Sequence, residues 1–199
     1  MSNYLFAIWI ILSAGLLLLF FYAAFLNLRR RNQPEVDLGD VIPFLLPVNV
    51  DALSQLIDPL QEAYSRHACT REEFQKLRRK RARLTVEYLR RMSHNAALLQ
   101  RVGYSQVHSS NSLVSGQAQE LIDAGVHVRL YTFVGLTILF LWRLLGLYAV
   151  PFVSLPKVSD VRELMSRSLI PAYEALRSKA ESLTTLRDSY FREGLVQSL

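Results

Sequence analysis

The 199-residue sequence predicts an all-α protein, with an N-terminal transmembrane helix and a helical cytoplasmic domain that contains a second apolar helix. Three observations support this prediction: a long uncharged run near the N-terminus, helix-start signals in the middle of the chain, and apolar residues at three-and-four spacing after them. The formal net charge of +6 favours anionic partners such as phospholipid head groups.

The N-terminal run covers residues 5–28, which carry no charge, and three arginines follow it, Arg29, Arg30 and Arg31. At about 1.5 Å per residue, a helix of this length exceeds the roughly 30 Å hydrocarbon layer of a bilayer. A cleaved signal peptide would carry a basic residue before a shorter apolar run, and residues 1–4 carry none. We therefore predict a membrane anchor over 1–31 with a stop-transfer signal. The positive-inside rule places the N-terminus outside and the remaining chain in the cytoplasm.

Residues 32–50 predict a stiff, extended linker rather than a helix, because they contain Pro34, Pro43 and Pro47. A basic helical region, 51–125, follows. Its first helix starts at Asp58, an N-cap residue that precedes a proline, and runs to about His67. The second starts at Thr70, which forms a capping box with Glu73.

A helix of about 30 residues is predicted after Thr70, because apolar residues share one face: Phe74, Leu77, Leu84, Tyr88, Met92, Leu99 and Val102. Arg81 and Asn95 fall in the same stripe, where polar residues fix the register of paired helices.

The opposite face of this helix is basic and carries Lys76, Arg79, Lys80, Arg83 and Arg90. A solvated surface over a helical core explains it most simply. Docking on anionic lipid also fits a chain that is tethered to a membrane. Nucleic-acid binding is not favoured, because no aromatic residues are interleaved with the basic ones and no recognition module is present.

Residues 103–116 are rich in serine and predict a loop, which a short helix, 117–124, follows; Gly125 would cap its C-terminus. The second apolar helix is predicted over 126–153. Its polar and small residues, Arg129, Thr132, Gly135, Arg143 and Gly146, gather on one face.

Arg143 decides between two interpretations of the second apolar helix. Hydropathy alone permits a second span, although a central arginine costs about 3 kcal/mol. However, the flank after the helix is the more basic one, with Lys157, Arg162 and Arg167, and a second span would carry it outward. We therefore favour a helix in the cytoplasmic interface or packed on protein, with Arg129 and Arg143 toward head groups or solvent. A second span stays open as the alternative.

The C-terminal region, 154–199, predicts a helix that begins near Ser159 and is interrupted at Pro171. Leucines recur every seven residues at Leu169, Leu176 and Leu183, and Tyr190 continues the series. Companion core positions are expected three residues later; these are Ala172 and Leu186, with Met165 before them and Lys179 as an exception.

No catalytic, cofactor-binding or metal-binding motif is recognisable, and the single cysteine, Cys69, excludes an internal disulfide. The sequence therefore predicts a non-enzymatic membrane protein for scaffolding, assembly or tethering, which binds anionic membrane, a protein partner, or both. The alternative is an accessory subunit of a larger membrane enzyme or transporter, in which Arg143 pairs with a carboxylate of another chain.

Overall fold

The computed structural model describes residues 38–145 and 162–187, which belong to one compact unit, 36–199. These residues form helices and no strand, which confirms the predicted all-α class. The predicted anchor with Arg29, Arg30 and Arg31 lies outside the described residues and stays a prediction.

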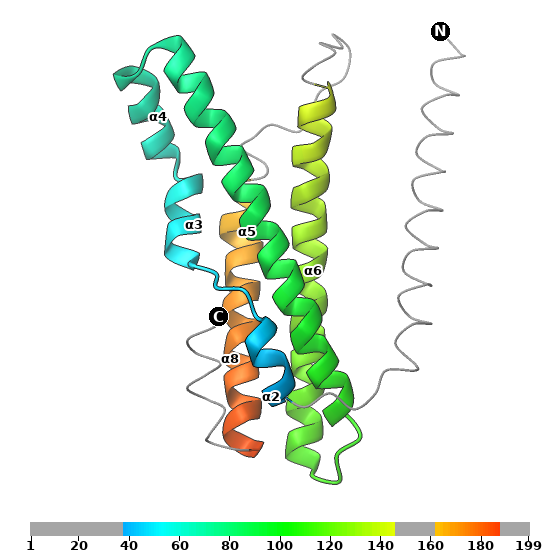
Figure 1. Ribbon diagram of the computed structural model, residues 1–199. Helices are drawn as coiled ribbons and strands as arrows, with labels where there is room; N and C mark the ends of the chain where they lie inside the picture. Colours follow the sequence, from blue (N-terminus) through cyan, green and yellow to red (C-terminus); the bar gives the residue numbers. More distant parts are fainter. Residues whose placement is uncertain (1–37, 146–161, 188–199) are drawn as a thin grey trace, which may run out of the picture. The chain divides into compact units, whose positions relative to one another are not determined.

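Three long helices form the core of this unit. They are α5 (Arg71–Gln106), α6 (Ser112–Leu145) and α8 (Ile170–Arg187), and residues 162–164 with the π-helical turn η2 (Met165–Leu169) lead into α8. Helix α6 lies antiparallel to both α5 and α8 (Figure 1). Shorter helical segments pack on α5: α2 (Leu38–Val41), α3 (Val50–Ile57) and α4 (Pro59–Ala68), with the 3-10 turn η1 (Ile42–Phe44) between α2 and α3.

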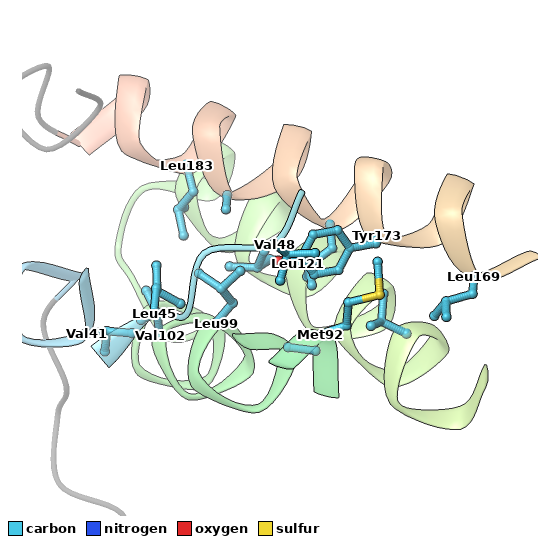
Figure 2. Packing of buried hydrophobic residues seen from close by; sticks show 14 of the residues in the cluster. Val41, Leu45, Val48, Met92, Leu99, Val102, Leu121, Leu169, Tyr173 and Leu183 are labelled. Atoms are coloured by element: carbon cyan, nitrogen blue, oxygen red, sulfur yellow. The ribbon is translucent and has the colours of Figure 1, made fainter. Parts of the chain in front are cut away.

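Both long helices of the α5–α6 hairpin bury positions that recur every seven residues. On α5 these recurring buried positions are Thr85, Leu89, Met92, Ala96, Leu99 and Gly103, and on α6 they are Val114, Ala118, Leu121, Gly125, Val128, Thr132 and Gly135. Alternating steps of three and four keep one face of a helix against its neighbour. The predicted stripe on α5 is confirmed at Met92, Leu99 and Val102 (Figure 2), whereas Leu84 is 36% exposed.

The loop predicted over 103–116 covers only residues 107–111, and the helix end predicted at Gly125 is wrong. α5 continues to Gln106, α6 begins at Ser112, and Gly125 lies inside α6. A β-carbon at Gly103 would lie 2.7 Å from Ile122 Cγ1, and one at Gly125 would lie 2.4 Å from Gln100 Cγ. Both glycines therefore allow α5 and α6 to approach closely, a role that the sequence cannot distinguish from a turn or a cap.

The predicted extended linker also needs correction. Within the described residues 38–50 of this segment, Leu38–Val41 is helical, Ile42–Phe44 is a 3-10 turn, and residues 45–49 lack regular structure. Val41, Leu45 and Val48 are buried in the hydrophobic core, where Figure 2 shows Val48 near Tyr173. The segment is therefore part of the bundle, because its apolar side chains bury more surface there than an extended linker would allow.

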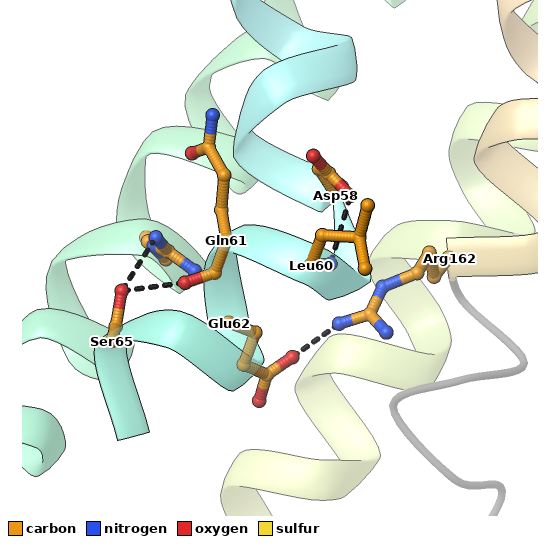
Figure 3. Close-up of polar contacts among 7 residues, drawn as sticks. Asp58, Leu60, Gln61, Glu62, Ser65 and Arg162 are labelled. Atoms are coloured by element: carbon orange, nitrogen blue, oxygen red, sulfur yellow. Dashed lines mark hydrogen bonds and ion pairs between the residues drawn. The ribbon is translucent and has the colours of Figure 1, made fainter. Parts of the chain in front are cut away.

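Both predicted helix starts are confirmed. Asp58 accepts a hydrogen bond from the Leu60 N–H at 2.9 Å, with Pro59 as the first residue of α4, and Thr70 and Glu73 form the capping box of α5. Figure 3 shows how α4 is held: Ser65 accepts from Arg81 of α5, and Glu62 pairs with Arg162. Arg81 therefore contacts α4 rather than the core seam in which it was predicted.

Replacing Thr70 by alanine should raise the pKa of Glu73 toward its ordinary value. The Thr70 hydroxyl, at 2.7 Å, and the Thr70 backbone N–H, at 3.0 Å, both donate to the Glu73 carboxylate and lower its pKa. Because the folded-state pKa is lowered, this stabilisation is present above the unfolded-state pKa and is lost as the pH falls through the folded-state pKa. An NMR titration of Glu73 measures the change, and Gln75→Ala, an exposed substitution on the same helix, is the control. An unchanged Glu73 pKa in the Thr70 variant would contradict the prediction.

The last helix continues through Pro171 instead of being interrupted there. Directly before this proline, the Ile170 N–H bonds to the Met165 carbonyl in a π-helical turn. The wider turn accommodates a proline, whose nitrogen cannot donate a hydrogen bond and whose ring crowds the carbonyl four residues earlier. The predicted leucines Leu169, Leu176 and Leu183 are buried.

Of the predicted companion positions of these leucines, Met165 is buried as expected, and the others differ from the prediction. Tyr173 and Ala180, four residues after a leucine, are buried, whereas Leu186 is 47% exposed and Ala172 is only half-buried. Lys179, the expected exception, forms an ion pair with Glu120 of α6.

Candidate functional site

The five predicted basic residues, Lys76, Arg79, Lys80, Arg83 and Arg90, are all exposed on α5. None of them has a hydrogen-bond or ion-pair partner within the described part of the chain. Other arginines of this helix do have partners; Arg91, for example, pairs with Glu87 and donates to the Pro47 carbonyl at 3.3 Å. The five free cations are therefore available to an external anion.

The fold presents four of these cations, those that precede Arg90, by leaving the first part of α5 thinly covered. The buried residues of this helix start only at Thr85, and before that point α5 packs on α4. The capping box at Thr70 begins the helix, and the three-and-four spacing turns the basic side chains away from the α6 side.

Helix α6 combines a buried seam with an exposed apolar row. Over Ser112–Phe140 it is long and apolar enough to cross a membrane. Four large apolar residues of its outer face are exposed by 41–60%: Val126, Leu130, Phe133 and Phe140. A row of this kind is a surface that favours an apolar environment.

Two residues of the polar face predicted on the second apolar helix, Thr132 and Gly135, point into the bundle. Thr132 and Gly135 are buried, and a β-carbon at Gly135 would lie 3.4 Å from Leu89 of α5. Arg129 is half-buried and donates to Gln100 Oε1 at 3.0 Å. Arg143 is in α6, but its side chain lies outside the described part of the structure, so its predicted contact with a partner or an interface stays untested.

Gln100 links the two long helices, and the sequence did not point to it. Its side chain is 2% exposed, its Nε2 donates to the Ile122 carbonyl at 3.1 Å, and its Oε1 accepts from Arg129. It lies directly against Gly125. A buried amide with both ends satisfied fixes one register between the helices.

Asn95 holds the irregular segment 45–48 against α5 and α8. Its Oδ1 accepts from the Leu46 N–H at 2.9 Å, and its Nδ2 donates to the Leu46 carbonyl at 2.7 Å and to the Tyr173 hydroxyl at 2.9 Å. Asn95 is fully buried, as its predicted seam position implies. Burial raises the pKa of Tyr173, and the hydrogen bond from Asn95 opposes this shift. The sequence signal for Tyr173 was weak, because it stands one residue after the expected companion position.

The described residues contain no group of three or more histidine, cysteine, aspartate or glutamate side chains that could hold a metal ion. Two surface hollows of about 580 and 450 Å³ flank Pro47, and both are open to solvent. The features with a clear binding chemistry are therefore the free cations of α5 and the exposed apolar row of α6.

Comparison of the chain with protein-family models, with curated proteins and with solved structures found no match.

Proposed function

We propose that this chain is a membrane-anchored tethering or assembly protein, whose helical bundle docks from the cytoplasmic side on anionic membrane. One observation carries the proposal: the five exposed basic residues of α5 have no partner within the described residues. Each basic residue held near an acidic bilayer contributes about 1 kcal/mol. The predicted anchor over 1–31 would keep the bundle close to the bilayer, so that modest attraction suffices.

The packing of α6 supports a position of the bundle at the membrane surface rather than across it. The seam of α6 is buried against α5 and α8. Because Gly135 contacts Leu89, Arg83 and Arg90 lie at the same height along the helix axes as the most apolar part of α6. If α6 crossed the bilayer in this packing, both arginines would enter hydrocarbon at a cost of about 3 kcal/mol each.

Energy transfer from a dye on the native cysteine to the membrane surface tests this proposal. The full chain is labelled at Cys69, which lies between α4 and α5, and is reconstituted into vesicles that carry acceptor dyes on their head groups. With phosphatidylserine in the vesicles we expect high transfer, which falls as salt rises because exposed charges are screened over about 8–10 Å. With phosphatidylcholine alone the transfer should be low.

A matched pair of variants separates the basic face from net charge. Arg79, Arg83 and Arg90 changed together to glutamine should lose the dependence on acidic lipid. The control variant changes Arg162, Arg167 and Lys179 together to glutamine, which removes the same charge around η2 and α8. It should keep the dependence on acidic lipid. Transfer that is indifferent to lipid charge and to salt would overturn the proposal.

A further inference from the structure

We infer that the α5–α6 hairpin binds acidic membrane through a face with two parallel rows, which rests on the proposed function and deepens it. The arginine row on α5 consists of Arg79, Arg83, Arg90 and Arg101, and the apolar row on α6 consists of Val126, Leu130, Phe133 and Phe140. The arginines contact lipid phosphates, and the apolar side chains enter the boundary between head groups and acyl chains. Arg101 is a member that the amphipathic pattern of the sequence did not include.

Each row runs straight along its helix. Steps of four, seven and eleven residues separate the four arginines, and all of these are close to whole turns at 3.6 residues per turn. Steps of four, three and seven separate the apolar residues, which therefore stay within a sector of about 80°. All eight side chains are exposed.

The contacts of the two helices place both rows on the side of the hairpin opposite α8. On α5, Asn95 contacts α8 and Gln100 contacts α6. Around the helix axis, Gln100 lies about 140° from Asn95, and Arg90 lies about 80° beyond Gln100 in the same direction. On α6, Glu120 contacts α8, Gly125 contacts α5 about 140° further round, and Phe133 lies about 80° beyond.

On each helix the same rotation leads from the α8 contact, through the contact with the other long helix, to the row. Viewed from one end of the hairpin, this rotation is clockwise on one helix and anticlockwise on the other, because α5 and α6 run antiparallel (Figure 1). The arginine row and the apolar row therefore point to the same side of the hairpin, away from α8.

The rows also match in level along the hairpin. Leu89 lies opposite Gly135, and Gln100 lies opposite Gly125. Arg90 is therefore level with Phe133, and Arg101 with Val126. The carboxylate nearest to the arginine row in sequence, Glu87, is paired with Arg91.

An acidic bilayer is the partner that this arrangement fits best. Helices that lie in the membrane interface carry a row of apolar side chains with cations along one edge of the row. The core of a protein interface is instead depleted of charge. The membrane offers phosphates to the arginines and hydrocarbon to the apolar row at the same time.

Depth measurement with a fluorescent label tests this inference on the full chain. In a Cys69→Ser background, single cysteines replace Phe133 or Leu130 on the apolar row, or Ser178 on the exposed side of α8. In vesicles with phosphatidylserine, labels at 133 and 130 should be quenched by lipid-attached nitroxides, at a depth of about 5–10 Å below the head groups. The label at 178 should stay in water. The Arg79, Arg83 and Arg90 triple variant should return the label at 133 to water.

The outcomes separate this inference from the proposed function. If energy transfer from Cys69 shows docking on acidic vesicles but the labels at 133 and 130 stay in water, the bundle docks through another surface and the inference fails alone. If neither signal responds to acidic lipid, both fail. Labels that are shielded from water but not quenched by lipid nitroxides would show that protein covers the row, which would also overturn the inference. Two label positions guard against a loss of folding at either one.

Discussion

Replacing Asn95 by alanine should lower the free energy of unfolding by about 3 kcal/mol, because three polar groups lose their hydrogen bonds to its side chain. These groups are the N–H and the carbonyl of Leu46 and the hydroxyl of Tyr173. Tyr173 is 1% exposed, so water cannot easily replace the lost bond. Urea unfolding of the full chain in mild detergent, followed by circular dichroism, measures the loss.

Two further variants make the Asn95 prediction specific. Gln75→Ala removes an exposed amide from the same helix and should change stability by less than about 0.5 kcal/mol. Tyr173→Phe removes one of the three bonds, and its effect should not add fully to that of Asn95→Ala, because the two residues share a hydrogen bond. A loss at Asn95 no larger than that at Gln75 would show that the segment 45–48 is not held by this side chain.

Substitution of glycine by alanine at two positions of α6 should have effects of opposite sign. Gly116→Ala should stabilise the protein by about 0.5–1 kcal/mol, because an added β-carbon meets nothing within 4 Å and alanine favours the helix. Gly125→Ala should destabilise it by about 2 kcal/mol, because its β-carbon would lie 2.4 Å from Gln100 Cγ. Gln100 cannot move aside without losing its bonds to Ile122 and Arg129.

The same unfolding measurement decides the glycine prediction. The two variants differ only in what surrounds the added methyl group, so helix propensity cancels in the comparison. Equal stabilisation at both positions would mean that α5 and α6 do not approach as closely at Gly125 as the structure has them.

Helix starts and the chemistry of the surface could be read from the sequence alone. Asp58 with Pro59, and Thr70 with Glu73, act within one helical turn, so the residues that form each cap are neighbours in the chain. The leucines at 169, 176 and 183 were equally readable, because their spacing follows from helix geometry. The basic residues of α5 were found for the same reason, since a helical period places them on one face.

Tertiary structure decided what the local signals left ambiguous. Gly125 has the sequence signature of a helix cap, yet it lies inside α6 because the neighbouring helix places Gln100 against it. The prolines at 43 and 47 suggested a linker, but Val41, Leu45 and Val48 are buried on a bundle formed by residues far along the chain. Contacts between distant residues, such as Gln100 with Arg129, 29 residues apart, determine where the arginines of α5 lie relative to α6. A local sequence pattern specifies a helix and its faces. Only the packing of distant segments determines which helix faces contact one another, because the possible contacts between segments compete over the whole molecule.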